Sequence, residues 1–336
     1  MTKVQDIGEQ GVLAKLQRFC PPGMIGDDAA VLLTAPDKSL VVTTDVLVDG
    51  VHFSNVTTSP EDAGWRAVAA NLSDLAAMGA FPIGITVGLG LPGELMVSWV
   101  ERLYQGMTEC LQKYNTVIVG GDIVRSPVTT ISITAFGQVD PQKIIRRDAA
   151  QVGDAIVVTG VHGASHAGLQ LLLHPELKQN LTDAEQRIFI TAHQRPQPRL
   201  DVLPTLWEIP TFYPPSPHPS IAGMDSSDGL ADAILQICHT SGVGAVLEAS
   251  QIPLPATFSH WLTPDQALEY ALYGGEDFEL VLCLPEVIAH TLVTKLGDRA
   301  AIVGTITTGS QVILHDQQKK LPDQVLTLSR GFQHFT

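Results

Sequence analysis

The fold is decided by one stretch, Asn71-Leu72-Ser73-Asp74-Leu75-Ala76-Ala77-Met78-Gly79-Ala80, which is typical of the second half of a helix. Upstream of it, Ser59 suits an N-cap, Pro60 suits the first helical position, and two acids follow. Gly79 then provides the stop signal. One face of the helix is small and mostly apolar, so we expect it to pack closely on a sheet; it comprises Ala63, Ala67, Ala70, Asn71, Asp74 and Met78.

A carboxylate on this face, Asp74, is the first candidate functional residue. Neither Lys nor Arg lies within two turns before it or one turn after it. A carboxylate packed on a sheet is costly unless a cation meets it. The alternative is an ordinary surface Asp that is hydrogen-bonded to a neighbouring loop, and this fragment alone leaves both interpretations open.

Length and composition indicate a two-domain protein. The chain has 336 residues, which is more than one ordinary core accommodates, and 45% of them are hydrophobic. The four cysteines are scattered, which argues against a zinc site and against a secreted disulfide framework. The first residues have no apolar core like that of a signal peptide, and no apolar run is long enough to span a membrane. We therefore expect a cytoplasmic protein with no membrane partner.

The charge argues against nucleic acid as a partner. The net charge is −15, with 35 acidic residues against 20 basic ones, whereas nucleic-acid binding needs a basic face. Solubility explains most of these acids. Several others occupy positions that solubility does not explain.

The hydrophobic pattern predicts alternating helices and strands, hence an α/β (α+β) fold. We expect a first domain at 1–148 and a C-terminal α/β domain at 149–336. Expected strands are 26–33, 39–45, 83–89, 116–119, 128–136, 154–160, 280–284 and 301–303. Expected helices are 7–19, 59–79, 94–114, 163–173, one opened by 221–230 that runs to about 240, 263–274 and 286–296. The proline-rich segment 203–220 is expected to be a surface loop or an extended insertion.

Acidic residues recur where an apolar run meets a turn. Asp28, Asp45, Asp122 and Asp225 share this setting, and Asp74 and Asp228 lie on or at the start of adjacent helices. For a single Asp, a turn or cap role is the ordinary explanation. If all six converge, however, their repulsion requires cations. Because the donors are oxygens, including the hydroxyls of Thr43 and Thr44, they suit Mg²⁺ better than zinc.

Magnesium among carboxylates indicates phosphate chemistry, but the sequence has no P-loop motif. Residues 88–93 match the pattern Gly-x-Gly-x-x-Gly, but we do not expect a nucleotide-binding loop here, because Pro92 is unfavourable for the helix that should follow. Better candidates for phosphate or nucleotide contacts are the backbone of Gly120-Gly121 and the side chains of Ser227 and Arg147. For Arg147 the alternative is a linker charge.

The chain resembles thiamine-monophosphate kinase along nearly its whole length. The motifs that carry the resemblance follow the order of that family: Gly26-Asp27-Asp28-Ala29-Ala30, Thr43-Thr44-Asp45, Gly50-Val51-His52-Phe53, Asn71 to Ala80, Gly120-Gly121-Asp122, Ser226-Ser227-Asp228-Gly229-Leu230, Gly274-Gly275-Glu276-Asp277-Phe278-Glu279-Leu280 and Gly331-Phe332-Gln333-His334-Phe335. The wider superfamily includes aminoimidazole ribonucleotide synthetase, selenophosphate synthetase and a hydrogenase maturation dehydratase.

The resemblance implies the aminoimidazole ribonucleotide synthetase-like fold, with N-terminal sheets that pair across a homodimer and ATP in a cleft between the domains. It implies transfer of the γ-phosphoryl group of ATP to thiamine phosphate, giving thiamine diphosphate. Carried over by position, the ligands of several Mg²⁺ ions would be Asp28, Thr43, Thr44, Asp45, Asp74, Asp122, Asp225 and Asp228. ATP would contact Tyr104, Gly121, Asp122, Arg147 and Ser227, and thiamine phosphate would contact His52, Glu276 and Phe332.

Direct in-line transfer is the expected mechanism. The acceptor phosphate oxygen is already anionic, so it needs no general base, and metal ions would offset the repulsion between two anionic substrates. Phe332 could stack on the thiamine rings or simply close a small C-terminal core. Likewise, His52 could contact substrate or pack beside Phe53.

Two kinds of alternative remain open. The first is a sister enzyme of the same fold, although this chain lacks the expected reactive cysteine settings of selenophosphate synthetase and of the hydrogenase maturation protein. Aminoimidazole ribonucleotide synthetase, in turn, lacks the context of residues 274–277. The second is a non-catalytic metal- or nucleotide-binding regulator.

Overall fold

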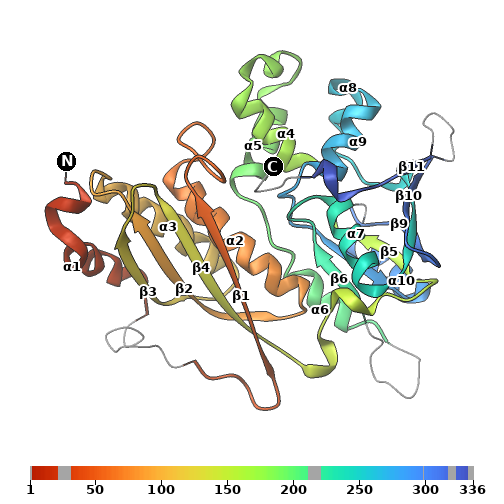
Figure 1. Cartoon of the computed structure of the whole chain (residues 1–336), viewed down its shortest axis with the longest axis horizontal. Coiled ribbons are helices and arrows are strands. Elements are labelled where there is room, and N and C mark those ends of the chain that lie inside the picture. The colour runs from red at the N-terminus through yellow and green to blue at the C-terminus, as the bar shows by residue number, and fades with distance from the viewer. Residues whose placement is uncertain (1, 22–31, 211–220, 298, 317–322, 332–336) are drawn as a thin grey trace. The chain divides into compact units, whose positions relative to one another are not determined.

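The computed structural model describes residues 2–21, 32–210, 221–297, 299–316 and 323–331 (Figure 1). The chain forms two compact units, each described by itself below. Unit 1 comprises Met1–Leu75 and Ala80–Pro141, and unit 2 comprises Ala76–Gly79 and Gln142–Thr336. The candidate residues Asp28 and Phe332 lie outside the described residues, as does most of the expected strand 26–33. The domain boundary after Asp148 stays a prediction.

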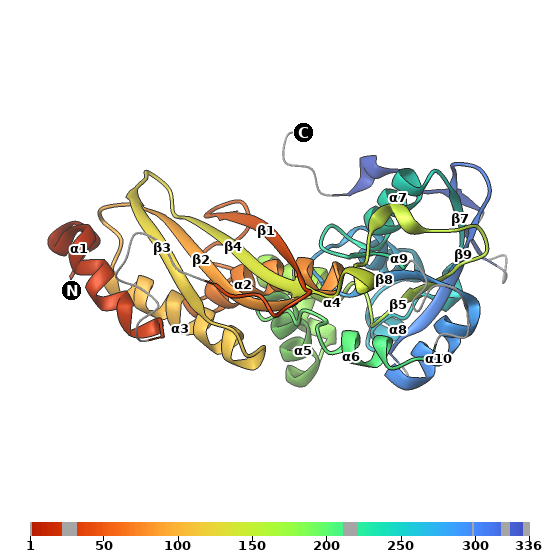
Figure 2. The ribbon, with the colours of Figure 1, turned by 90° about the horizontal axis from the view of Figure 1, so that it is seen from below.

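Unit 1 is a four-stranded sheet with helices on one face. The sheet order is β1-β4-β2-β3, where β4 is antiparallel to both neighbours and β2 is parallel to β3. Its strands are β1 (Ser39–Val48), β2 (Phe81–Leu91), β3 (Ile118–Arg125) and β4 (Thr130–Val139), and its helices are α1 (Val4–Leu16), α2 (Pro60–Ala77) and α3 (Val97–Lys113). Figure 2 shows α2 and α3 side by side on one face of this sheet.

The central helix α2 begins and ends where the sequence predicts. The Ser59 hydroxyl accepts a hydrogen bond from the Asp62 amide (3.2 Å) and donates one to the Asp62 carboxylate (2.7 Å). At the other end Gly79 has φ +75°, which a glycine adopts without strain, and the Ala80 amide donates to the Leu75 carbonyl (2.8 Å). Local capping chemistry therefore determines the length of this helix.

Two glycines let α2 approach α3 at backbone distance. A Cβ atom at Gly106 would lie 1.8 Å from the Glu61 carbonyl oxygen, and one at Gly64 would lie 2.0 Å from the Leu103 carbonyl oxygen. No side chain could be accommodated at either point without moving a helix. This contact sets how closely α2 packs against α3, and it thereby helps to determine the position of Asp74.

The two faces of the unit 1 sheet differ in character. On the helix-covered face, Ile85, Val87 and Ile133 are fully buried. On the opposite face, Leu40, Val42 and Val46 of the edge strand β1 are 52%, 53% and 47% exposed. The second face is thus an open apolar surface, which monomeric proteins rarely leave uncovered.

Unit 2 is an α/β layer structure around a seven-stranded sheet with the order β11-β10-β7-β9-β5-β8-β6. Its strands are β5 (Ala155–Val158), β6 (Ala222–Asp225), β7 (Gly244–Glu248), β8 (Leu280–Leu284), β9 (Ala301–Thr307), β10 (Val312–His315) and β11 (Gln324–Val325). Its helices are α4 (Ala164–Leu173), α5 (Asp183–Gln194), α6 (Val202–Trp207), α7 (Leu230–Ser241), α8 (Phe258–Trp261), α9 (Pro264–Tyr273) and α10 (Glu286–Leu296). Helices α7 and α10 lie on opposite faces of the sheet (Figure 2).

Three expectations about the elements are wrong. The proline-rich segment begins as a packed helix, because Val202, Leu203 and Leu206 of α6 are buried and Pro204 sits in its first turn. The strands β1 and β3 continue past Asp45 and Asp122, so neither acid ends a strand. Residues 222–225 form strand β6 instead of opening a helix, and the strands β7, β10 and β11 and the helices α5 and α8 were not expected at all. By contrast, the mixed α/β character is confirmed.

None of the helices in the described ranges is long and apolar enough to cross a membrane.

Candidate active site

The first group of candidate residues lies on the helix-covered face of unit 1. Asp45 alternates with exposed neighbours along β1 and faces α2, as does Thr43. The Thr43 hydroxyl donates a hydrogen bond to the Asp74 carboxylate. The contact joins a strand to a helix 31 residues further along the chain. The structure therefore brings two predicted magnesium ligands, Thr43 and Asp74, into direct contact.

A buried amide oxygen accompanies this group. Asn71, one turn before Asp74 on α2, is 0% exposed, and its Nδ2 group donates to the Ala67 carbonyl (2.9 Å). Its Oδ1 atom has no hydrogen-bond donor among the described residues. Orphaned buried oxygens are rare and call for an explanation. An amide oxygen one turn from Asp74 on the same helix is of a donor type that suits a hard cation.

Asp122 does not join this group within one chain. It pairs with Gly88 in the β2–β3 ladder, while the next pair, Ile123 with Leu89, is buried on the helix-covered face. Asp122 is therefore exposed on the open face, together with Thr44. The two strands β1 and β3 are also opposite edges of the sheet, roughly 14 Å apart at the usual strand spacing.

The other predicted contacts in unit 1 have structural surroundings of their own. Tyr104 is 5% exposed on α3, where burial raises the pKa of its hydroxyl, and its ring lies against Phe19. Gly121 has no room for a side chain, since a Cβ atom would lie 2.3 Å from the Val87 carbonyl oxygen. His52 accepts a hydrogen bond from the Val48 amide at Nδ1 (3.0 Å). Their roles as ATP or substrate contacts stay predictions.

In unit 2, two motif segments are fastened together. The first is the turn Asp225-Ser226-Ser227-Asp228, at the end of β6, and the second is the loop 274–279, which leads into β8. The Glu276 amide donates to the Ser227 carbonyl (2.7 Å), and the Ser226 amide donates to the Glu279 carbonyl (2.9 Å). These bonds place the predicted metal ligands Asp225 and Asp228 beside the predicted substrate contact Glu276.

The loop 274–279 is held in a strained conformation. Glu276 and Phe278 have left-handed φ angles of +60° and +52°, which side chains other than Gly and Asn rarely adopt. Each such residue costs on the order of 1–2 kcal/mol, and strain of this kind is concentrated at functional sites. The Glu276 carboxylate also lies 3.5 Å from Nδ1 of His193, a buried residue of α5.

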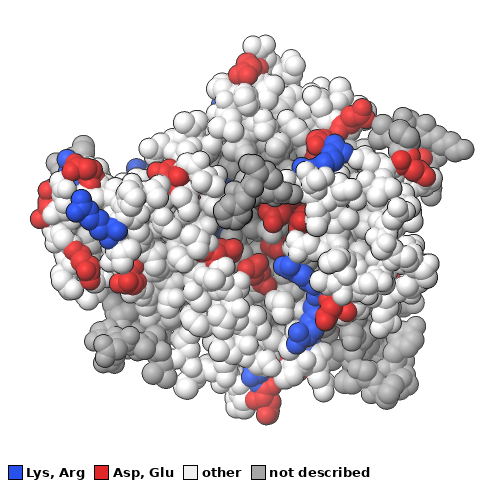
Figure 3. All heavy atoms as spheres, in the orientation of Figure 1, with Lys and Arg blue, Asp and Glu red and all other residues white. Residues whose placement is uncertain are grey.

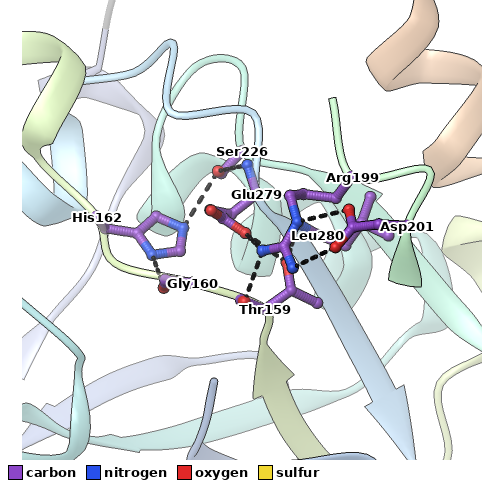
Figure 4. A network of polar contacts seen from close by, with 8 residues as sticks. All are labelled: Thr159, Gly160, His162, Arg199, Asp201, Ser226, Glu279 and Leu280. Atoms are coloured by element: carbon purple, nitrogen blue, oxygen red, sulfur yellow. Dashed lines mark hydrogen bonds and ion pairs between the residues drawn. The ribbon is translucent and has the colours of Figure 1, made fainter. Parts of the chain in front are cut away.

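The two remaining acids of this motif make structural contacts. Asp277 accepts hydrogen bonds from the amides of Gly163 (2.6 Å) and Ser165 (2.9 Å) at the start of α4, and burial raises its pKa to about 7. Glu279 accepts a hydrogen bond from the Thr159 hydroxyl (2.6 Å) and pairs with Arg199 (Figure 4). Burial raises the pKa of Glu279, and the charge of Arg199 partly offsets that effect.

Arg147 lies beside α7. Its guanidinium donates to the Gln236 side chain (2.9 Å), and its carbonyl accepts hydrogen bonds from the hydroxyls of Thr240 and Ser241. Its backbone follows Arg146, which forms an isolated bridge to Ala222 at the start of β6. Arg147 is thus tied to the same strand and helix that flank the Asp225 turn.

The donor set fits magnesium, although the described part of the chain holds no complete metal cluster. Among the described residues, no three His, Cys, Asp or Glu side chains gather as a metal site. The candidate donors are carboxylates, hydroxyls and one orphaned amide oxygen, all of them hard ligands. On the face drawn in Figure 3, the described Lys and Arg side chains form no large basic area.

Sequence reasoning missed three residues of unit 2 that support the site: His162, Arg199 and, as an ion-pair partner, Glu279. His162 reaches Ser226 across 64 positions, and Arg199 reaches Glu279 across 80. No local sequence pattern predicts contacts between residues so far apart in the chain. The only signal for these residues in the sequence was the number of acidic residues in the motif that contains Glu279.

Comparison with known proteins assigns the family. Residues 26–139 match the model described as AIR synthase related protein, N-terminal domain, and residues 151–317 match its C-terminal domain counterpart. A thiamine-monophosphate kinase from Synechococcus elongatus is 51% identical over 336 residues, covering 99% of this chain and 98% of the relative.

Solved structures agree with this result. The thiamine-monophosphate kinase of Stenotrophomonas maltophilia K279a superposes with a TM-score of 0.75 at 33% identity, covering 92% of this chain and 95% of that one. A structure described as AaThiL complexed with AMPPCP and TMP has a TM-score of 0.70 at 29% identity, covering 97% and 98%. This chain therefore belongs to the thiamine-monophosphate kinase family and is built from the two AIR synthase related domains.

Proposed function

We propose that this protein transfers the γ-phosphoryl group of ATP to thiamine phosphate, producing thiamine diphosphate. The observation that carries the proposal is the 51% identity to a thiamine-monophosphate kinase along almost the whole length of both chains. The structural relative complexed with AMPPCP and TMP supports it further, because AMPPCP is an analogue of ATP.

We propose Mg²⁺ as the metal, held by the oxygen donors named above: Asp28, Thr43, Thr44, Asp45, Asp74, Asp122, Asp225 and Asp228. Bound Mg²⁺ would supply neutralisation of the phosphate charges. The ATP contacts would be Tyr104, Gly121, Asp122, Arg147 and Ser227. The thiamine phosphate contacts would be His52, Glu276 and Phe332.

The chain's own contribution to the chemistry is alignment. The acceptor is an anionic phosphate oxygen, so no residue has to remove a proton from it. The strained loop and the hydrogen-bonded turn of unit 2 hold their carboxylates in place before the substrates bind, which lowers the cost of reaching an in-line geometry. Direct transfer predicts net inversion at a chiral γ-phosphorus, whereas retention would indicate a phosphoenzyme.

We propose that the protein is a homodimer joined through the unit 1 sheets. The open face with Leu40, Val42 and Val46 is the surface that supports this. Because Asp122 lies on that face and on the edge opposite β1, pairing of β1 with β3 of a second copy would bring Asp122 near Thr44 of its partner, the residue that precedes Asp45. The magnesium site would then draw ligands from both copies.

A cytoplasmic location is the remaining part of the proposal. None of the four cysteines, all of which the structure describes, forms a disulfide, and three of them are buried, as in proteins of reducing compartments. The supply of ATP in that compartment points the same way.

An ATP-consumption assay with and without thiamine phosphate tests the activity. We expect consumption to depend on both thiamine phosphate and Mg²⁺, with thiamine diphosphate as product. Consumption that is unaffected by thiamine phosphate would favour another enzyme of the fold, and binding of ATP without turnover would favour a regulator.

Light scattering during gel filtration tests the dimer. We expect the wild type to have twice the mass of the 36.0 kDa chain and Val42→Glu to shift toward monomer, because it places a charge on the open face. Val287→Glu is the matched control, since Val287 is 68% exposed on α10 of unit 2. A monomeric wild type would refute the dimer.

A further inference from the structure

A directional chain of hydrogen bonds runs through buried His162 to the turn that carries Asp225. His162 Nδ1 lies 3.2 Å from the Gly160 carbonyl oxygen, which can only accept, so Nδ1 carries the proton. In the neutral ring Nε2 is then an acceptor, and it receives the Ser226 hydroxyl at 3.1 Å (Figure 4). Ser226 Oγ in turn accepts from the Glu279 amide (3.2 Å).

Burial keeps this chain in one orientation. His162 and Ser226 are both 0% exposed, and burial lowers the pKa of His162 to about 4. A protonated ring would present two donors and leave the Ser226 hydroxyl proton without its acceptor. The neutral ring therefore fixes the hydroxyl of Ser226, which lies between Asp225 and Ser227.

An ion pair anchors the same turn from the other side. The Arg199 guanidinium pairs with Glu279 and donates to the Thr159 carbonyl (2.7 Å). The Thr159 hydroxyl donates to Glu279 (2.6 Å) and accepts from the Leu280 amide (2.8 Å). Both side chains of the pair are at least four-fifths buried, with 17% and 15% exposed. Loss of this pair is costly for Glu279, whose buried charge would have no ion-pair partner, whereas Arg199 would keep its pair with Asp201.

The three acids of the loop 274–279 therefore have different partners. Asp277 is occupied by the amides of α4, and Glu279 is occupied by Arg199 and Thr159. Glu276, in the strained part of the loop, is fastened through its own amide to Ser227, and its carboxylate lies 3.5 Å from Nδ1 of His193. Glu276 is the acid of this motif for which we propose a contact with substrate.

We propose that His162 and Glu279 are positioning residues for the phosphoryl transfer: they hold the Asp225–Asp228 turn against the Glu276 loop and touch neither metal nor nucleotide. The inference rests on the proposed function for the roles of Asp225, Asp228 and Glu276. Mutation of residues that hydrogen-bond to metal ligands without touching the metal typically lowers metal affinity or activity about 10–100-fold.

The first test compares His162→Leu with His162→Gln. Leu removes both hydrogen bonds, whereas Gln can keep an acceptor near the Ser226 hydroxyl. We expect Leu to raise the Mg²⁺ concentration for half-maximal activity about tenfold or more and Gln to restore most of the loss. Val303→Ala is the matched control, because Val303 is 0% exposed in β9 and bonds to none of these residues. All variants are assayed well below their measured Tm.

The second test compares Glu279→Gln with Asp201→Asn. Both remove one carboxylate from the same arginine, but Asp201 is 64% exposed and bonds to neither motif segment. We expect Glu279→Gln to lower kcat about tenfold or more with a changed Mg²⁺ requirement, and Asp201→Asn to leave both near wild type. Equal effects of the two variants would overturn the proposal.

A readout without turnover separates this proposal from the proposed function. Amide hydrogen exchange measures how firmly the Glu276 and Ser226 amides are held. We expect His162→Leu, but neither His162→Gln nor Val303→Ala, to lose protection at these amides. Normal protection in His162→Leu would refute the positioning role even in an active enzyme. A wild type with strong protection but no thiamine phosphate kinase activity would refute the function alone.

Discussion

The two units present their candidate residues in opposite ways. In unit 2, Asp225, Asp228 and Glu276 are fastened together by backbone hydrogen bonds and by buried side chains behind them. In unit 1, the candidate ligands are divided between two faces and two edges of one sheet, with Asp45 on one side and Asp122 on the other. The candidate residues of unit 2 lie together within one chain, whereas Asp45 and Asp122 of unit 1 lie apart.

This difference indicates where each half of the site obtains its precision. The turn in unit 2 is organised by contacts that fold with the unit. The sheet in unit 1 carries its candidate ligands on two edge strands, which in the proposed dimer a second copy would bring together. The predictions below test this contrast from the largest expected effect to the smallest.

Asp45→Ala should reduce kcat by at least about 100-fold, because a predicted metal ligand is lost next to Thr43 and Asp74. Circular dichroism and the Tm should remain close to wild type, since the residue is only partly buried. Steady-state assays at saturating ATP, Mg²⁺ and thiamine phosphate provide the measurement. A near-normal rate would remove Asp45 from the site.

Mixing two inactive variants should restore activity if the unit 1 site is shared. When Asp45→Ala and Asp122→Ala chains are co-refolded, random pairing leaves about a quarter of the sites with both acids intact. Activity should therefore recover to about a quarter of wild type. The same variants refolded separately are the control. No recovery would mean that each chain supplies both acids to its own site.

Asp277→Asn should change how stability depends on pH. The pKa of Asp277 is raised to about 7 in the folded protein from 3.8, so its contribution is fully present below pH 3.8 and is lost as pH rises to about 7. The unfolding free energy of wild type relative to Asp277→Asn should thus fall by roughly 4 kcal/mol over this range. Urea titrations at pH 4 and pH 7 measure it, and a constant difference would contradict the assignment.

For His162→Gln, the pH dependence of the stability difference from wild type should have the opposite sign to that for Asp277→Asn, and it should be slightly smaller. The pKa of His162 is lowered to about 4 from 6.5, so its contribution is fully present above pH 6.5 and is lost as pH falls to about 4. The advantage of wild type over the variant should shrink by roughly 3 kcal/mol on acidification. An advantage that grows toward acid pH would show that the buried ring is charged.

Elements with local signals could be predicted from the sequence, and elements set by distant contacts could not. The caps of α2 and α9, at Ser59 and Thr263, form as expected because a cap depends on three or four consecutive residues. The strands β7, β10 and β11 are short and take their identity from pairing across the sheet. Helix α6 was obscured by prolines, one of which suits its first turn.

The same contrast, between local sequence signals and contacts of distant residues, applies to the candidate site. Family motifs named Asp225, Ser227 and Glu276, which the structure brings together. The expectation that Asp45 and Asp122 end their strands was wrong, because an acid on the exposed or half-buried side of a strand does not interrupt its pairing. His162 and Arg199 could not be found, since their partners are far away in the chain.

The left-handed backbone at Glu276 and Phe278 has a consequence for protein engineering. Glycine at position 276 would relieve about 1 kcal/mol of strain, so a library selected for heat resistance alone should enrich it there, whereas at position 278 it would empty the space of a buried phenylalanine. At position 276 the same exchange removes the carboxylate proposed to meet substrate. Directed evolution of this enzyme should therefore produce robust but inert clones unless each round also selects for turnover.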